Sequence, residues 1–247
     1  MKQSILLKML TFSLGVSFLL LSCNSGGGNE SAAPAKDSTA MDTSAMKAPE
    51  PAPAAQVSKV LFIKQNVANY DKWKKAYDAH DSARLANGLT NFIIGRGMKD
   101  PNAVLVILKM DDVDKGKAFS ESTDLKTKMK EAGVIGKPDI QFIDVVMNDT
   151  TKIDLNGRLM VTHKVKDWDT WKKVFDDHKQ ARMDAGLIDR GLGYSDGDNH
   201  TVTIIFAVND KKKADTFLNS KDLKAKMDSG GVVGPPTTFY YNIVQKY

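Results

Sequence analysis

Four side chains that could do chemistry recur at helical spacing in two segments of the chain. In the first segment they are Trp73, Tyr77, His80 and Arg84. Steps of four, three and four residues place them on one stripe of a helix. A histidine has an ordinary pKa of about 6.5, which suits a general base. The second segment repeats the pattern with one aromatic exchange, as Trp171, Phe175, His178 and Arg182.

The same stripe also fits a packed core that does no chemistry. Aromatic residues at helical spacing more often belong to a core than to a binding site. A histidine on such a stripe can bond a backbone carbonyl, and an arginine can reach an acidic neighbour. Phe175 also lacks the hydroxyl of Tyr77, which a shared mechanism would need. Both interpretations therefore stay open.

The sequence predicts neither a metal nor a cofactor. The chain has one cysteine, and no HxxE or HxxxH motif or carboxylate cluster surrounds His80 or His178. The glycine loops 133–138 and 231–236, with lysines nearby, could offer N–H groups to an anion. A glycine just past a helix is more simply its C-cap, and we favour that interpretation.

A tandem repeat underlies the two stripes. Trp73-Lys74-Lys75 matches Trp171-Lys172-Lys173, and Gly133-Val134 matches Gly231-Val232. The matched positions lie about 98 residues apart without net insertion, and roughly thirty of about ninety are identical. The folded part is therefore one unit used twice. We place the first unit at residues 58–148 and the second unit at residues 157–247.

The sequence of each unit predicts strands and helices in the order βαββαβ. In the first unit we expect a strand at 60–63, a helix capped by Asn69 and ending before Gly88, and strands at 89–97 and 103–109. A second helical stretch follows Asp112, restarts at Ser122 and ends at Gly133, and Pro138 leads into a strand at 140–146. This order is the ferredoxin-like split βαβ unit of an α+β fold.

The run 103–108 is apolar without alternation, so both of its faces should be buried. Helices cover only one face of a βαββαβ sheet, and the second unit is the obvious cover for the other. The two sheets would pack face to face, or curl into a shared barrel, about a pseudo-twofold axis.

The N-terminus predicts export and lipid anchoring. Lys2 and Lys8 flank a short apolar stretch, as in a signal peptide. Leu20-Leu21-Ser22-Cys23 resembles the lipobox of bacterial lipoproteins, which are cut before the cysteine and acylated on it. We therefore expect a signal peptide at 1–22, lipidation of Cys23 and a disordered Gly-, Ser-, Ala- and Pro-rich tether at 23–57. An acylated Cys23 would make the lipid bilayer a partner of this protein. The expected location is the bacterial cell envelope, with the outer membrane favoured.

Charge argues against a nucleic-acid partner. The formal charge is +5, from 35 Lys and Arg against 30 Asp and Glu, and removal of Lys2 and Lys8 leaves +3. The lysines are scattered over helix patterns rather than gathered in a stripe. The aromatic signature of RNA-recognition motifs is missing from the run 103–108.

With these features the chain resembles the dimeric α/β-barrel superfamily that includes the antibiotic-biosynthesis-monooxygenase-like proteins. The resemblance rests on the βαββαβ order, the Asp-x-Trp-Lys-Lys openings at 71–75 and 169–173, the positions of His80 and His178, and the Gly-Val-x-Gly-x-Pro segments. In that superfamily two subunits usually pair. Here one chain supplies both halves, which suggests a monomeric, pseudo-dimeric body.

The resemblance implies a pocket between sheet and helices that binds a small apolar or aromatic molecule. His80 and His178 would be catalytic bases, and an arginine would stabilise the anion formed, in cofactor-free oxygenation or isomerisation. The alternative is a non-catalytic structural or interaction lipoprotein. The ligand-binding residues implied are Trp73, Tyr77, Arg84, Trp171, Phe175 and Arg182.

Overall fold

The computed structural model describes residues 58–247, which contain both units. The predicted signal peptide, Cys23 and the tether lie outside the described residues. The first unit consists of β1 (Ser58–Val67), α1 (Tyr70–Ala79), α2 (Asp81–Ala86), β2 (Leu89–Gly97), β3 (Ala103–Met110), α3 (Val113–Glu121), α4 (Thr123–Glu131) and β4 (Val134–Asn148). The second unit repeats this order with β5 (Gly157–Val165), α5 (Trp168–Asp177), α6 (Lys179–Asp184), β6 (Leu187–Ser195), β7 (Asp198–Val208), α7 (Lys211–Leu218), α8 (Lys221–Ser229) and β8 (Val232–Lys246).

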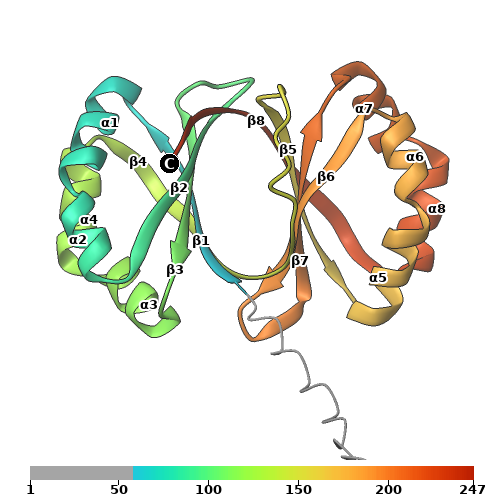
Figure 1. Ribbon diagram of the computed structural model, residues 1–247, viewed down its shortest axis with the longest axis horizontal. Helices are drawn as coiled ribbons and strands as arrows, with labels where there is room; N and C mark the ends of the chain where they lie inside the picture. The colour runs from blue at the N-terminus through green and yellow to red at the C-terminus, as the bar shows by residue number, and fades with distance from the viewer. Residues whose placement is uncertain (1–57) are drawn as a thin grey trace, which may run out of the picture. The chain divides into compact units, whose positions relative to one another are not determined.

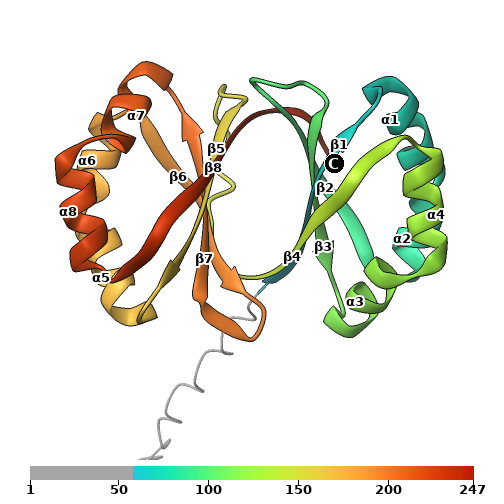
Figure 2. The ribbon, with the colours of Figure 1, turned by 180° about the vertical axis from the view of Figure 1, so that it is seen from behind.

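The strands of the two units form one closed antiparallel sheet, in the order β1-β3-β2-β8-β5-β7-β6-β4. Two pairings join the units. Gly95 on β2 lies opposite Ile243 on β8, and Val145 on β4 lies opposite Gly193 on β6. The helices of each unit pack outside its own strands, as Figures 1 and 2 show from opposite sides. The sheet therefore has an outer, helix-covered face and an inner face that surrounds the barrel interior.

Alternation along the strands divides the core between these two faces. On β1, Leu61 and Ile63 pack in the helix-covered core of the first unit, whereas Phe62 packs in the barrel interior. The interior cluster also contains Met160 and Tyr241 from the second unit. Residues 104–108 on β3 are each at most 4% exposed. The expected burial of both faces of this strand is thus confirmed.

Side-chain caps set the helix boundaries where the sequence predicts them. Asn69, Asp112 and Ser122 each accept a backbone N–H from the first turn of α1, α3 and α4. Gly88 has a φ of 68°, which favours glycine, and it follows α2. No helix in the described part of the chain is long and apolar enough to cross a membrane.

The first helix of each unit is broken, which corrects the prediction of one continuous helix up to Gly88. α1 ends at Ala79, and α2 begins after His80, whose φ and ψ of −97° and 17° leave the helical region. The guanidinium of Arg84 donates from Nη1 to the carbonyl of Tyr77, at 2.7 Å. This contact satisfies a carbonyl near the end of α1 and so stabilises the break.

The segment 134–138 lies in β4, although the sequence predicts a loop before a strand at 140–146. Gly133 behaves as the expected C-cap, because its φ is 85° and its N–H donates to the carbonyl of Lys130. The strand continues through Pro138 because the pairing with β1 shifts register between Lys64 and Asn66. Such a bulge tolerates the missing N–H of a proline.

Candidate functional site

The second unit contains a cavity of about 350 Å³ between its strands and helices α5, α7 and α8. Its walls are mainly aliphatic and aromatic. Cavities of this size and character are typical sites for small molecules. The polar side chains that line it are His163, His178, Arg182, Asp215, Asn219, Lys226, Thr238 and Tyr240.

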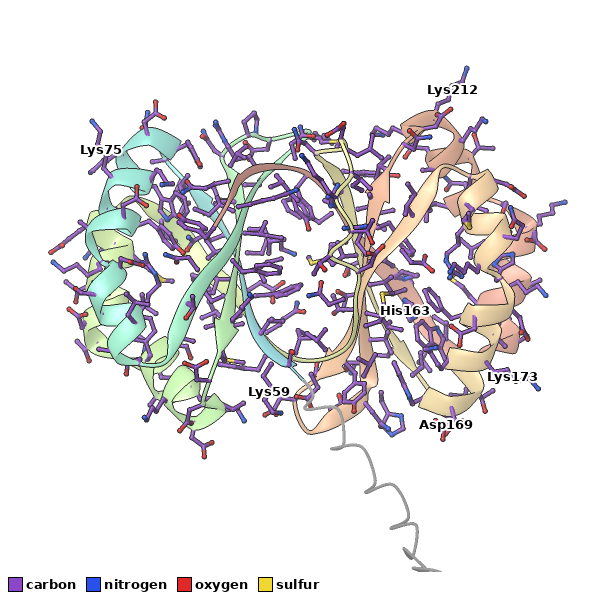
Figure 3. All side chains as sticks on the ribbon, in the orientation of Figure 1. Lys59, Lys75, His163, Asp169, Lys173 and Lys212 are labelled. Atoms are coloured by element: carbon purple, nitrogen blue, oxygen red, sulfur yellow. The ribbon has the colours of Figure 1, made fainter. Side chains whose placement is uncertain are left out.

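His163 is the buried polar group of this cavity that the sequence analysis missed. Its side chain lies on the helix-covered face of β5, in step with Val161 and Val165. It is 7% exposed, and neither Nδ1 nor Nε2 has a hydrogen-bond partner within residues 58–247. Figure 3 shows it between the strands and the helices of the second unit. In the sequence, the only sign of this group was a single histidine in step with the apolar residues of a predicted strand.

Burial controls the protonation of His163. Removal from water lowers the pKa of its imidazole from 6.5 to about 4, because the charged form loses its hydration. The ring is therefore neutral at about pH 7, with one nitrogen donating and the other accepting. A buried polar group without a partner costs the fold about 1–3 kcal/mol. A ligand that bonds the imidazole would remove this cost.

The predicted stripe, which runs along α5, the break at His178 and α6, forms one wall of the same cavity. Trp171, Phe175, His178 and Arg182 all line it. The rings of Trp171 and Phe175 stack with centroids 5.0 Å apart, and the indole lies 5.4 Å from the ring of His163. The structure therefore brings the four residues together and adds a second histidine to them.

His178 is held by a carboxylate. Its Nε2 lies 2.8 Å from Oδ2 of Asp222 in the first turn of α8. His80 makes the equivalent 2.8 Å contact with Asp124 in the first turn of α4. Each contact links the break in the first helix to a neighbouring helix and fixes the ring orientation. The same geometry could orient a base, as a carboxylate does for a catalytic histidine.

The arginines of both stripes are bound by protein groups. Arg182 forms two bonds to the carboxylate of Asp189, at 2.9 and 2.7 Å, and donates to the carbonyl of Phe175. Its guanidinium carbon lies 3.6 Å from the centroid of the Phe175 ring. These contacts neutralise the charge and favour a structural role for Arg182.

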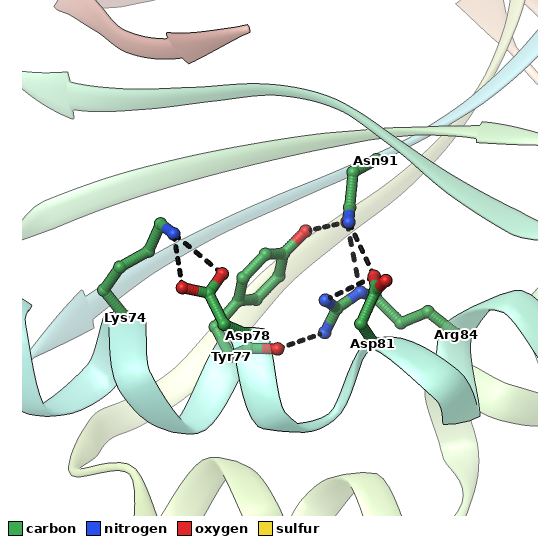
Figure 4. Close-up of polar contacts among 6 residues, drawn as sticks. All are labelled: Lys74, Tyr77, Asp78, Asp81, Arg84 and Asn91. Carbon is green, nitrogen blue, oxygen red and sulfur yellow. Dashed lines mark hydrogen bonds and ion pairs between the residues drawn. The ribbon is translucent and has the colours of Figure 1, made fainter. Parts of the chain in front are cut away.

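In the first unit, a neutral group and an exposed carboxylate replace the partly buried carboxylate of Asp189. Arg84 donates to Asn91 and to Asp81, and the hydroxyl of Tyr77 also donates to Asn91, as Figure 4 shows. The same figure contains the exposed ion pair of Lys74 with Asp78 on α1. Trp73 is 2% exposed and stacks on Tyr77 at 5.1 Å. The first-unit stripe is thus packed and hydrogen-bonded as a core would be.

Polar groups from β8 and α7 further distinguish the second unit. The hydroxyl of Tyr240 donates to Asp215 at 2.9 Å, and Asp215 also binds Lys211. Burial is the main cause that raises the pKa of Tyr240, so its hydroxyl stays protonated. The positions 98 residues earlier carry Phe142 and Lys117. In residues 58–247 no group of three His, Cys, Asp or Glu side chains is arranged to hold a metal ion.

Known proteins resemble this chain in fold. By sequence, it matches no family model and no curated protein. An anthrone oxidase-like protein aligns with a TM-score of 0.53 and 11% identity, over 78% of this chain and 94% of that chain. A candidate monooxygenase from Fusobacterium nucleatum subsp. nucleatum aligns with a TM-score of 0.50 and 11% identity, over 77% of this chain and 94% of that chain.

These alignments confirm the coarse prediction of the fold. The chain is an α+β protein whose ferredoxin-like fold is similar to that of these monooxygenase-type proteins. At 11% identity the likeness extends to the fold alone.

Proposed function

We propose that this protein binds a small apolar or aromatic molecule in the cavity of the second unit, with His163 as its polar contact. The observation that carries the proposal is the imidazole of His163, which is buried beside the cavity with both nitrogens unpartnered. Core histidines are normally hydrogen-bonded to protein or water, so an imidazole without a protein partner beside a cavity supports a polar contact from a molecule bound there.

The walls of the cavity suggest the shape of this molecule. The stacked rings of Trp171 and Phe175 form a flat apolar surface against which an aromatic ligand would pack. A hydroxyl or carbonyl on that ligand would bond the neutral imidazole of His163. The best candidate is therefore a flat, mainly apolar molecule with one polar group.

Proton transfer would be the first chemical step if the protein is an enzyme. His178, oriented by Asp222, would take a proton from an acidic C–H or O–H of the ligand. The resulting anion is the species that cofactor-free oxygenation or isomerisation requires. The names of the two structural neighbours, an anthrone oxidase-like protein and a candidate monooxygenase, agree with oxidation chemistry. In the first unit, His80 with Trp73, Tyr77 and Arg84 remains a proposed counterpart site.

We further propose that the folded body is a monomeric pseudo-dimer held at the bacterial cell envelope. Equivalent elements recur 98 positions apart, from α1 and α5 to β4 and β8, and this supports a duplicated unit. The lipobox at Leu20-Leu21-Ser22-Cys23 supports an acyl anchor in the membrane, the outer membrane being favoured. A lipid-anchored body would meet apolar molecules that partition into the bilayer.

Binding of naphthol and naphthalene to the full chain tests the ligand proposal. Quenching of the tryptophan fluorescence reports occupancy of the cavity, because Trp171 lines it whereas Trp73 and Trp168 do not. One neutral hydrogen bond is worth about 1 kcal/mol, so wild type should prefer naphthol about fivefold. His163→Leu should remove the preference, and Gln65→Leu, at the equivalent position of the first unit, should keep it. If neither compound binds, or if His163→Leu keeps the preference, the non-catalytic structural alternative becomes the better account.

A further inference from the structure

A second, larger cavity lies on the opposite face of the sheet, inside the barrel. Its volume is about 1080 Å³. Apolar side chains from both units line it, among them Phe62, Ile107, Ile205 and Ile243. Nothing in the function proposed above uses this space.

The lining of the barrel cavity is positively charged. Six cationic side chains line it, against the two carboxylates of Asp111 and Asp149. Some of these charges are paired: Arg190 binds Asp149 at 2.8 Å, and Lys59 binds Asp144 and Asp196. The cations are Lys59, Lys109, Lys152, Arg158, Arg190 and Lys246.

Arg158 is the unusual member of this set. It is 4% exposed and forms no ion pair within residues 58–247. Its Nη1 donates to the backbone carbonyls of Leu155 and Gly157, at 2.7 and 2.9 Å. The described residues supply no acceptor for Nε or Nη2, which leaves three N–H donors for another partner. A buried charge without a counter-charge is costly, so an arginine at this place needs an explanation.

The surroundings of Arg158 complete a pocket for an anion. Tyr241 is its cross-strand partner on β8, is 1% exposed and lines the same cavity. Burial raises the pKa of the Tyr241 hydroxyl, which therefore stays protonated and can donate. Arg190 lies close enough to lower the pKa of Arg158 further, although burial is the larger cause. The corresponding position in the first unit is Val60, an ordinary apolar residue of the barrel interior.

We propose that the barrel interior is a second binding site, for an oxyanion carried on an apolar body. Arg158 and Tyr241 would bind the oxyanion, and the aliphatic and aromatic lining of both units would cover the apolar part. The planar guanidinium fork suits a carboxylate or a phosphate, since both present two oxygens at matching spacing. An amphiphilic ligand explains the charge and the apolar lining together, which a free inorganic anion would not.

Calorimetric titration of the full chain with octanoate and octanol tests this proposal. The two molecules share a chain length, so their difference isolates the charged head. Wild type should bind octanoate at least tenfold more tightly than octanol. The affinity for octyl phosphate, compared with that for octanoate, shows whether the site prefers a phosphate or a carboxylate head group. The affinity for acetate shows how tightly the carboxylate binds without the apolar chain. Arg158→Met should abolish the preference for octanoate, whereas Arg158→Lys, which keeps the charge but loses the planar fork, should retain only part of it.

Two controls keep the result specific to the barrel interior. Arg96→Met removes an arginine that bonds Pro101 outside this cavity, so the octanoate preference should persist. Phe62→Trp places a fluorescent ring in the lining, and octanoate should shift its emission. The natural tryptophans lie away from this cavity, so in wild type their emission should stay constant.

Either of two results would overturn the proposal. One is equal affinity of wild type for octanoate and octanol. The other is an octanoate preference that survives Arg158→Met. A preference lost in His163→Leu but kept in Arg158→Met would place the ligand in the second-unit cavity instead, so failure of this site is distinguishable from failure of the proposed function.

Discussion

Replacing His163 with leucine should make the protein less sensitive to acid. The pKa of this imidazole is about 4 in the folded protein, against 6.5 for an exposed histidine. Between these values the unfolded chain binds a proton that the folded protein does not. Wild type therefore has its full stability above about pH 6.5 and loses it as the pH falls toward 4.

The size of the effect follows from the same two pKa values. Each pKa unit corresponds to about 1.4 kcal/mol, so His163 should cost wild type about 2 to 3 kcal/mol between about pH 7 and about pH 4.5. The carboxylates titrate in wild type and variant alike, so subtracting the two curves isolates the histidine. Leucine also removes two unsatisfied nitrogens, which should raise stability at pH 7 by about 1 to 3 kcal/mol.

Urea unfolding of the full chain at several pH values measures this difference. Gln65→Leu is the matched control, because Gln65 is 6% exposed and also has an unpartnered oxygen but does not titrate. It should raise stability by a similar amount without changing the pH dependence. Parallel pH curves for wild type and His163→Leu would refute the reasoning.

Three further changes test other parts of the structure. Arg182→Met leaves the partly buried carboxylate of Asp189 unpaired and should cost about 2 to 4 kcal/mol by urea unfolding. This is more than the cost expected for Arg84→Met, whose partners are Asn91 and the exposed Asp81, and equal costs would contradict the assigned partners. Gly95→Ala would put a Cβ 2.3 Å from Cδ2 of Tyr241 and should cost about 1 to 3 kcal/mol by thermal unfolding, whereas Gly191→Ala, with its nearest contact at 3.5 Å, should cost less. Cys23→Ser should stop labelling by palmitate and release the protein from the membrane fraction of expressing cells, and a variant still found in that fraction would argue against the acyl anchor.

Local signals in the sequence were sufficient for most of the fold. The repeat predicts two equivalent units, and Asn69, Asp112 and Ser122 marked helix starts through short-range caps. The apolar run 103–108 required cover on both faces, and the pairing of β2 with β8 and of β4 with β6 supplies it. Each of these inferences depends on neighbouring residues or on simple periodicity.

The break at His80 and the choice of site depend on contacts that periodicity does not encode. The break is stabilised by Arg84, which returns to a carbonyl seven residues earlier. Alternation along β5 places His163 on the helix-covered face, but only the three-dimensional packing shows that no side chain in residues 58–247 reaches its nitrogens. The sequence could name the stripe of Trp171 and His178, but both units carry such a stripe, so it could not place the 350 Å³ cavity in the second unit.

The closed order of the strands also bears on how the chain folds. β8 pairs with β2 as well as with β5, and it is the last strand of the described residues. Until β8 pairs, the backbone groups along one edge of the first unit lack partners, and such edges readily pair with other chains. Sequence-distant pairings of this kind slow folding and prolong the exposure of partly folded intermediates. A partly folded first unit would therefore be prone to aggregation until β8 closes the ring of strands.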